Sequence, residues 1–141
     1  LPLNRIRRRL NRQLGIKADV VFFENKSFAK QVNFCSEHEV IISPHGAQLT
    51  SSWAVPAGGL VIEICNPEWV PYDLFPGLSL SSSKSHTVIC ENHPFPEWRF
   101  SPVPQKRLDI RCDVSKVVGE VRNYIQRVKK GDHKELEFKL L

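Results

Sequence analysis

The chain has 141 residues, of which 41% are hydrophobic and 25% charged, and a formal net charge of +5. This composition is that of an ordinary soluble globular domain, or of one lobe of a larger protein. No apolar run approaches the roughly 18 residues that a membrane-spanning helix needs, and the arginine-rich N-terminus lacks the apolar core of a signal peptide. Because Met is absent throughout, we expect the sequence to be a piece of a longer protein.

The excess positive charge lies mainly near the N-terminus, with a smaller group near the end. A pI of about 9.2 allows an acidic partner, either nucleic acid or nucleotide phosphates. Since no aromatic residues interleave with the basic ones, we expect no nucleic-acid partner; a solvated basic face explains the same pattern. The residues concerned are Arg5, Arg7, Arg8, Arg9 and Arg12, then Arg127, Lys129 and Lys130.

The N-terminal third predicts helix, strand and helix. Residues 3–14 carry an apolar stripe at helical spacing with arginines on the other face, and Gly15 ends that helix. Residues 18–23 (ADVVFF) have the composition of a buried strand. Ser27 is placed to cap a helix over residues 28–36.

The central stretch predicts two parallel strands joined through a short helix. The apolar run 40–42 ends in Ser-Pro, the chain turns through His45-Gly46-Ala47, and residues 48–55 have helical composition. After a Pro-Ala-Gly-Gly break, residues 60–64 (LVIEI) form a second apolar run. Strands connected in this way imply an α/β fold, a Rossmann-like parallel sheet covered on both faces. Ligands bind such sheets at the carboxyl ends of the strands.

The second half is less regular. Prolines and a glycine argue against a long element over residues 68–80, and residues 79–85 have the composition of a surface loop. Asp113 is placed to cap a helix over residues 114–130, whose apolar stripe is explained by core packing. Short strands are expected at residues 86–90 and 108–112, an irregular excursion at 92–105, one domain over 1–131, and a frayed tail over 132–141.

The four cysteines are far apart, without a C-x-x-C pair, so we expect no metal site. If the strands at 60–64 and 86–90 are neighbours, Cys65 and Cys90 approach at one edge. A disulfide would then join them, provided that their Cα atoms lie within about 7 Å. Buried structural thiols are the alternative.

Two residues of the central stretch invite a functional explanation. A helix N-terminus after His45-Gly46-Ala47 offers unpaired N–H groups and partial positive charge to a phosphate, and Gly46 permits close approach. His45 could donate a hydrogen bond to that phosphate or carry a proton; a histidine satisfied by nearby backbone is the alternative. Glu63 would be costly to bury unpaired, so it either holds ribose hydroxyls at the strand end or pairs with an arginine.

At this point the sequence resembles a known family. SPHGAQLTSSWAVPAGGLVIEI is similar to the nucleotide-sugar-binding core of glycosyltransferase family 61, with its HGA-x-L-T motif and its later V-I-E-[IL] strand. Gln31 matches a glutamine in the family's preceding helix, and RRLNRQL resembles the family's R-x-I-x-N-E-x-E-L segment. The resemblance covers roughly residues 5–80. The sequence departs from the pattern at Ser51 and Trp53, and at Arg12 and Gln13, which replace an acidic pair.

The resemblance implies the donor-binding lobe of a GT-B type, inverting glycosyltransferase whose acceptor lobe precedes it. The donor would be a UDP-sugar carrying N-acetylglucosamine or a pentose, the acceptor a glycan or glycoprotein hydroxyl. No cofactor and no obligatory metal are implied, in agreement with the absence of a D-x-D motif; the catalytic residues are unassigned. The compartment would be the Golgi or endoplasmic reticulum lumen in a eukaryote, and otherwise the cytoplasm. The implied substrate-binding residues are His45, Gly46, Ala47, Gln48 and Glu63, with Arg8, Arg9 and Asn11.

Two other classes of protein remain open on the sequence alone. One is a non-catalytic α/β module that binds a nucleotide or an acidic partner. The other is a basic nucleic-acid-binding domain, which the missing aromatics disfavour.

Overall fold

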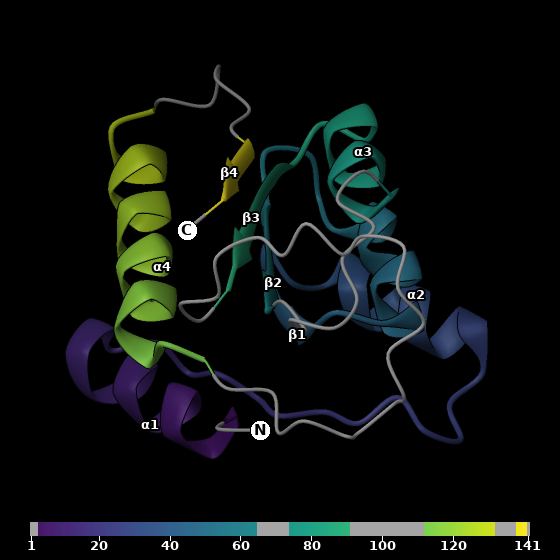
Figure 1. Ribbon diagram of the computed structural model, residues 1–141, viewed down its shortest axis with the longest axis horizontal. Helices are drawn as coiled ribbons and strands as arrows, with labels where there is room; N and C mark the ends of the chain where they lie inside the picture. Colours follow the sequence, from purple (N-terminus) through teal and green to yellow (C-terminus); the bar gives the residue numbers. More distant parts are fainter. Residues whose placement is uncertain (1–2, 65–73, 91–111, 132–137, 141) are drawn as a thin grey trace, which may run out of the picture.

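A four-stranded parallel sheet forms the middle of the molecule, in the order β1-β2-β3-β4 (Figure 1). The computed structural model describes residues 3–64, 74–90, 112–131 and 138–140, the last of these as backbone only. The strands are β1 (Val40–Pro44), β2 (Leu60–Ile64), β3 (Ser85–Ile89) and β4 (Phe138–Leu140). This arrangement confirms the predicted α/β class with a parallel sheet and flanking helices.

The register brings the carboxyl ends of three strands to one edge. Pro44 pairs with Ile64, and Ile64 pairs with Ile89. β2, in the interior of the sheet, is buried at every position, as expected of a strand covered on both faces. Its side chains alternate, so Leu60, Ile62 and Ile64 face one layer of helices, and Val61 and Glu63 face the other.

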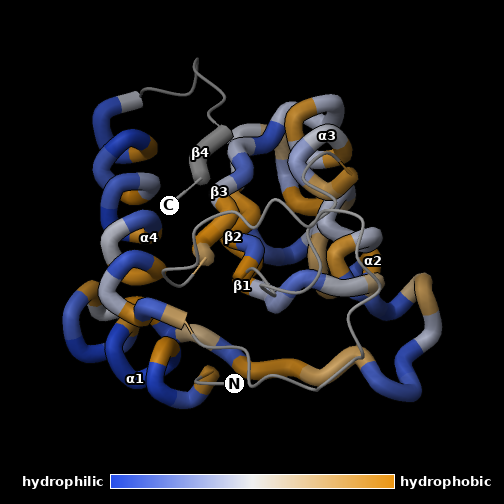
Figure 2. Tube along the Cα trace, viewed as in Figure 1, coloured by the Kyte–Doolittle hydropathy of each residue, from blue (hydrophilic) through white to orange (hydrophobic). Residues whose placement is uncertain are grey.

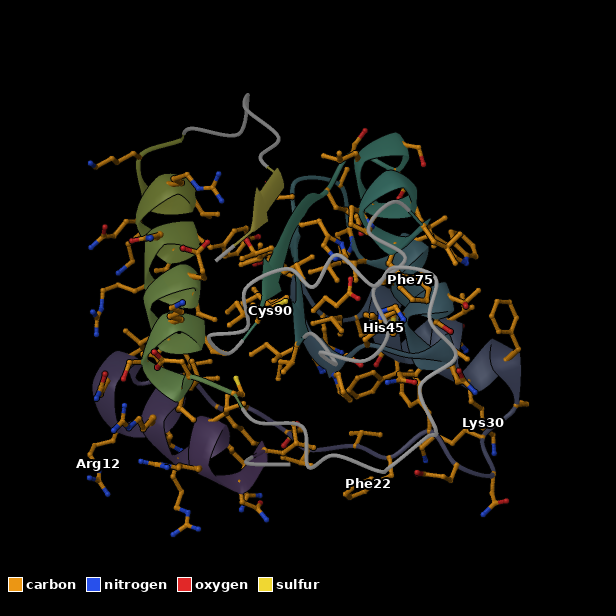
Figure 3. All side chains as sticks on the ribbon, viewed as in Figure 1. Arg12, Phe22, Lys30, His45, Phe75 and Cys90 are labelled. Carbon is orange, nitrogen blue, oxygen red and sulfur yellow. The ribbon has the colours of Figure 1, made fainter. Side chains whose placement is uncertain are left out.

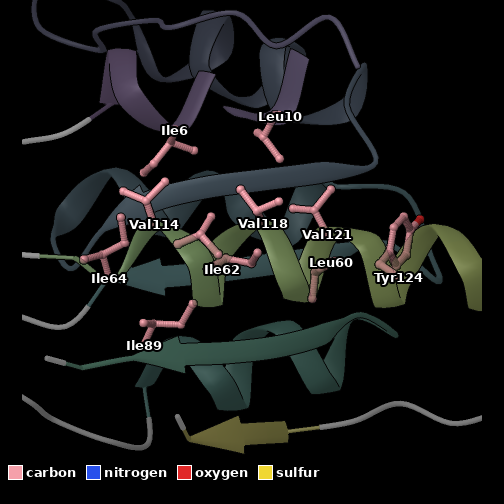
Figure 4. Close-up of a cluster of buried hydrophobic side chains, with 11 residues drawn as sticks. Ile6, Leu10, Leu60, Ile62, Ile64, Ile89, Val114, Val118, Val121 and Tyr124 are labelled. Carbon is pink, nitrogen blue, oxygen red and sulfur yellow. The ribbon is translucent and has the colours of Figure 1, made fainter. Parts of the chain in front are cut away.

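The first layer consists of α1 (Leu3–Leu14) and α4 (Val114–Lys129), which lie on the left of the sheet in Figure 1. Asp113 caps α4 as predicted, its carboxylate accepting from the amides of Ser115 and Lys116. Orange, apolar positions of both helices turn inward in Figure 2, and their outer faces are blue. Figure 4 shows the resulting core, made of Ile6, Leu10, Leu60, Ile62, Ile64, Ile89, Val114, Val117, Val118, Val121 and Tyr124.

The second layer consists of α2 (Phe28–Ser36), the 3-10 helix η1 (Ala47–Ala54) and α3 (Leu74–Ser81), on the other side of the sheet (Figure 1). Ser27 caps α2 as predicted, by accepting from the amide of Lys30. Gln31 is the side chain that links two of these helices, since its carbonyl oxygen accepts from the Ser51 hydroxyl at 3.3 Å. The apolar core of this layer is Cys35, Leu49, Val55, Val61 and Phe75.

The strand predicted at residues 18–23 is wrong. This segment has no regular secondary structure and crosses from the layer of α1 to the layer of α2 (Figure 1). Ala18 packs against the first core and Phe23 against the second, whereas Phe22 is 65% exposed. The apolar run therefore connects two cores and forms no ladder of strand hydrogen bonds.

Two predictions for the second half are also corrected. Residues 79–85 are not a surface loop, because α3 extends to Ser81 and Ser79 is 0% exposed. Pro76 is tolerated because it stands in the first turn of α3, where the amide has no helical partner to lose. The tail is not wholly frayed, since Phe138–Leu140 adds a parallel strand beside β3. The strand expected at 108–112 and the excursion at 92–105 lie largely or wholly outside the described residues.

Candidate functional site

The sequence between β1 and η1 places His45 at the carboxyl edge of the sheet. Its amide donates to the carbonyl of Ile64 at 2.8 Å, which extends the pairing of β1 with β2 by one residue. The imidazole lies edge-on to Phe75 of α3, with ring centroids 5.3 Å apart (Figure 3). His45 is thus held from three elements, β1, β2 and α3, at the edge where parallel sheets bind ligands.

Glu63 joins two histidines in the interior of the second layer. His45 Nδ1 forms a short hydrogen bond with Glu63 Oε1, and His86 Nε2 lies 2.9 Å from Glu63 Oε2. Glu63 is 2% exposed and His86 0%. Beyond His86, its Nδ1 lies 2.8 Å from the Ser79 hydroxyl. We call these four residues, His45, Glu63, His86 and Ser79, the buried histidine chain.

The histidine partners decide the protonation of Glu63. Burial is the largest single influence and raises its pKa, but the hydrogen bonds and charges of His45 and His86 together outweigh it and hold the pKa below its usual 4.5. Glu63 is therefore ionised at neutral pH. Because an ionised carboxylate can only accept hydrogen bonds, both imidazole nitrogens facing it are donors.

This geometry corrects the expectation that Glu63 pairs with an arginine. The carboxylate does not face water in a cleft, and within the described residues its partners are histidines rather than an arginine. Likewise the ring of His45 bonds a side chain on the neighbouring strand, and not nearby backbone. The ribose contact predicted for Glu63 would need this buried carboxylate to be uncovered by a ligand.

The loop after His45 presents free donors. The amides of Gly46, Ala47 and Gln48 have no hydrogen-bond acceptor among the described residues, since the first bond of the turn runs from the Leu49 amide to the Gly46 carbonyl. A Cβ at Gly46 would come within 2.6 Å of Gln48 Oε1. The Gln48 side chain is held there by its own bond to the Pro44 carbonyl at 2.8 Å.

The arginines predicted for the site lie on the other side of the sheet. Arg8, Arg9 and Asn11 belong to α1, in the first layer, whereas the His45 and Glu63 side chains meet in the second. Arg8 Nε donates to the Asn4 carbonyl at 3.3 Å, and Arg9 Nη1 to the Ser115 hydroxyl at 2.8 Å. Arg9 also lines a polar pocket with Arg5 and Lys116, beside the N-terminus of α4 and Cys90. The structure thus brings His45, Gly46, Ala47, Gln48 and Glu63 together, and leaves Arg8, Arg9 and Asn11 apart.

Sequence reasoning missed His86 and Ser79. His86 stands in a strand that was predicted, and a polar residue inside an apolar strand was the signal that singled out Glu63. The same test applied to SHTVI would have marked His86. Ser79 carried no such signal, because the proline-rich composition around it predicted a loop.

Further findings concern metals, cysteines and membranes. No cluster of three or more His, Cys, Asp or Glu side chains in the described ranges could hold a metal ion. Cys90 is disulfide-bonded, while Cys65 lies outside the described residues, so their pairing stays a prediction. Burial raises the pKa of the Cys35 thiol to about 11. Among the helices described, none combines the length and the apolar character needed to cross a bilayer.

Comparison with known proteins supports the expected resemblance. Residues 3–62, which include α1, β1, the His45 loop and most of β2, match the model of the family Glycosyltransferase 61. The resemblance expected from the sequence is thereby confirmed over this stretch. No solved structure matches the chain significantly.

Several vertebrate proteins are similar to the chain, all with the name protein O-linked-mannose β-1,4-N-acetylglucosaminyltransferase 2. The protein of Xenopus tropicalis is 31% identical over an alignment of 100 residues that covers 61% of this chain. Those of Mus musculus and Homo sapiens are 31% and 30% identical and cover 63% of this chain. The chain spans 17% of the length of each of these relatives.

Proposed function

We propose that this chain is the donor-binding lobe of a family 61 glycosyltransferase of GT-B architecture that takes its sugar from a UDP-sugar. The observation that carries the proposal is the loop at the carboxyl edge of the sheet, where three consecutive amides, without an acceptor among the described residues, lie beside an imidazole held by Glu63. Backbone N–H groups at the start of a helix are unpaired and already oriented, so they can bind phosphate oxygens without a rearrangement of the backbone. The diphosphate would lie against the amides of Gly46, Ala47 and Gln48, with the imidazole of His45 directed toward the sugar.

The arginines of α1 have a supporting role in this proposal. Arg9 and its neighbours Arg5 and Lys116 line a pocket at the same end of the sheet, beside the carboxyl end of β3 and the start of α4. Cations at that edge raise the local concentration of an anionic donor. Arg8 and Asn11 face a separate open surface with Arg12 and Lys17, and would act only through long-range charge.

The name of the relatives supports a proposal for the sugar and the acceptor. Their name describes transfer of N-acetylglucosamine to protein-linked mannose. We propose transfer of this sugar, or of a pentose, to a glycan or glycoprotein hydroxyl with inversion and no obligatory metal. A further lobe of the same protein would bind the acceptor, and the secretory pathway would be its compartment.

The test is UDP binding by the intact protein, followed calorimetrically, with Gly46→Val as the variant. A branched side chain at Gly46 collides with Gln48 Oε1 and blocks the amides, so UDP affinity should be abolished. Gly119→Val is the matched control, since a Cβ there meets nothing within 4 Å and α4 lies in the other layer. Circular dichroism checks that both variants fold. Unchanged UDP affinity in folded Gly46→Val protein contradicts the proposal.

A second candidate is a binding module without catalysis, which the same loop would equally support. UDP binding combined with no release of UDP from UDP-N-acetylglucosamine in the presence of an O-mannosylated peptide favours that module. Repeating the assay with UDP-xylose tests the pentose.

A further inference from the structure

The buried histidine chain determines which nitrogen of His45 carries a proton. His45 Nδ1 and His86 Nε2 each face a different oxygen of one ionised carboxylate, so each of these nitrogens is a donor. A neutral imidazole has only one N–H. In neutral His45 that proton is on Nδ1, which leaves Nε2 with a free lone pair.

At its inner end the buried histidine chain has no access to solvent. His86 and Ser79 are both 0% exposed, and the Ser79 hydroxyl lies 2.8 Å from His86 Nδ1, where it donates to the remaining lone pair of a neutral ring. Every polar atom beyond Glu63 is thereby satisfied. A fully satisfied polar network holds its members in one geometry.

At its outer end, His45, the buried histidine chain reaches the surface. The His45 side chain is 10% exposed, and the described residues place no hydrogen-bond partner on its Nε2. Phe75 packs edge-on against the ring and fixes its plane without offering a hydrogen bond. The single open acceptor of the network thus lies at the edge of the sheet where ligands bind.

We propose that His45 is the general base of the transfer, with Nε2 accepting the proton of the acceptor hydroxyl, and that Glu63, His86 and Ser79 position it. This inference rests on the proposed function. Glu63 fixes the Nδ1–H tautomer and compensates the imidazolium that forms; His86 and Ser79 fix the carboxylate. A carboxylate that orients an imidazole is the same division of roles found in hydrolytic triads.

The transfer replaces one bond at the anomeric carbon by another and moves one proton. As the acceptor oxygen forms its bond to the anomeric carbon, its proton passes to His45 Nε2. The bond from that carbon to the diphosphate oxygen breaks, and UDP leaves with the electron pair. The imidazolium then returns its proton to solvent, so that one proton is released for each sugar transferred.

Within the part of the chain that the structure describes, few titratable groups surround His45. Glu63 faces it from β2, and His86 lies behind Glu63 on β3. η1 has no charged residue and α3 presents Phe75. From α2 the buried group is Cys35, a thiol whose pKa is raised to about 11 and which stays uncharged. Among the described residues, Glu63 is therefore the ionised group that contacts His45.

The first experiment replaces the base in the intact protein. His45→Gln keeps a donor toward Glu63 but cannot take a proton, so kcat should fall by about 10²–10⁴-fold, with UDP affinity changed less than about threefold. Loss of UDP affinity with little change in kcat would make His45 a phosphate ligand and overturn the inference. His38→Gln is the matched control. His38 is not part of the buried histidine chain, since its Nδ1 bonds the Phe34 carbonyl, and its replacement should leave kcat unchanged.

The second experiment tests the positioning residues by measuring kcat and KM separately, per molecule of folded enzyme. Glu63→Gln should lower kcat while leaving KM for the UDP-sugar almost unchanged, because the imidazolium loses its compensating charge, and Ser79→Ala should lower kcat less. A merely structural Glu63 would lower only the amount of folded enzyme and leave kcat per folded molecule unchanged, which contradicts the inference.

A third measurement does not depend on any variant folding. Side-chain ¹⁵N NMR of the wild-type protein should show His45 as the Nδ1–H tautomer and His86 as the Nε2–H tautomer. The Nε2–H tautomer at His45 overturns the inference. Wild-type protein that neither binds UDP nor transfers sugar overturns the proposed function, and the inference with it; wild-type transfer with full activity in His45→Gln overturns the inference alone.

Discussion

Glu63 shows how a carboxylate can be kept in the interior of a parallel sheet. Alone, an ionised carboxylate in such a place would cost several kcal/mol. Here each of its oxygens accepts from a histidine, and the deeper histidine is satisfied in turn by Ser79. The desolvation cost is offset only while all partners are present. The charge therefore stabilises the fold and the geometry of His45 together.

The first prediction concerns Glu63 and pH. Its pKa is lowered on folding, so its contribution to stability is present above the unfolded-state value of 4.5 and is lost as the pH falls below it. Glu63→Gln should cost about 3–5 kcal/mol of unfolding free energy at pH 7. Its unfolding free energy should also depend less steeply on pH below 4.5 than that of the wild type. Urea unfolding between neutral and acid pH measures both, and equal stability of the two proteins at pH 7 would contradict this account.

At the scale of elements, the packing between β1, η1 and β2 depends on one glycine. A Cβ on Gly59 would lie 2.6 Å from Val55 Cγ1 and 2.7 Å from the Glu39 carbonyl oxygen. The second atom belongs to backbone that also accepts the Leu60 amide, so it cannot move without disturbing the strand pairing. The Pro-Ala-Gly-Gly break thus permits a close approach of two chain segments as well as a turn.

Gly59→Ala is the second prediction. Overpacking of this kind should cost about 1–3 kcal/mol of unfolding free energy. Gly77→Ala is the control, because a Cβ there meets nothing within 4 Å and alanine in a helix is favoured over glycine by about 0.5–1 kcal/mol. Thermal unfolding should shift in opposite directions for the two variants, and parallel shifts would show that the contact at Gly59 is relieved at little cost.

Sequence periodicity correctly predicted the elements whose surroundings follow one regular pattern along their length. α1 and α4 show one apolar stripe, and β2 one continuous apolar run, so each pattern has one structural solution. Residues 18–23 have strand composition, yet they bridge two cores, which depends on contacts far away in sequence. His45 and Glu63 could be singled out from the sequence, since both stand in the stretch SPHGAQLTSSWAVPAGGLVIEI. The link to His86 required the register of β2 against β3.

At the scale of the whole molecule, each face of the sheet is covered by a layer of helices, with an apolar core between the sheet and each layer. Ile62 is 0% exposed and belongs to the core that joins α1 and α4 to the strands. Figure 4 shows it between Ile64 and Leu60, facing the helices. Glu63, the next residue, faces the opposite layer. β2 therefore couples the stability of the first layer to the geometry of the site in the second.

A disulfide at the carboxyl edge would lock this sheet where the site lies, which gives the last prediction. Cys90 directly follows β3 and is disulfide-bonded, and Cys65 directly follows β2 in the sequence. Because β2 and β3 are paired neighbours ending at the same edge, we expect the bond to join Cys65 to Cys90. Closing a loop of this size stabilises a protein by about 3 kcal/mol. Peptide mapping without reductant should recover the Cys65–Cys90 pair, with Cys35 alkylated only after denaturation because it is buried. Recovery of Cys90 paired with any other cysteine would refute the assignment and the strand-end geometry on which it rests.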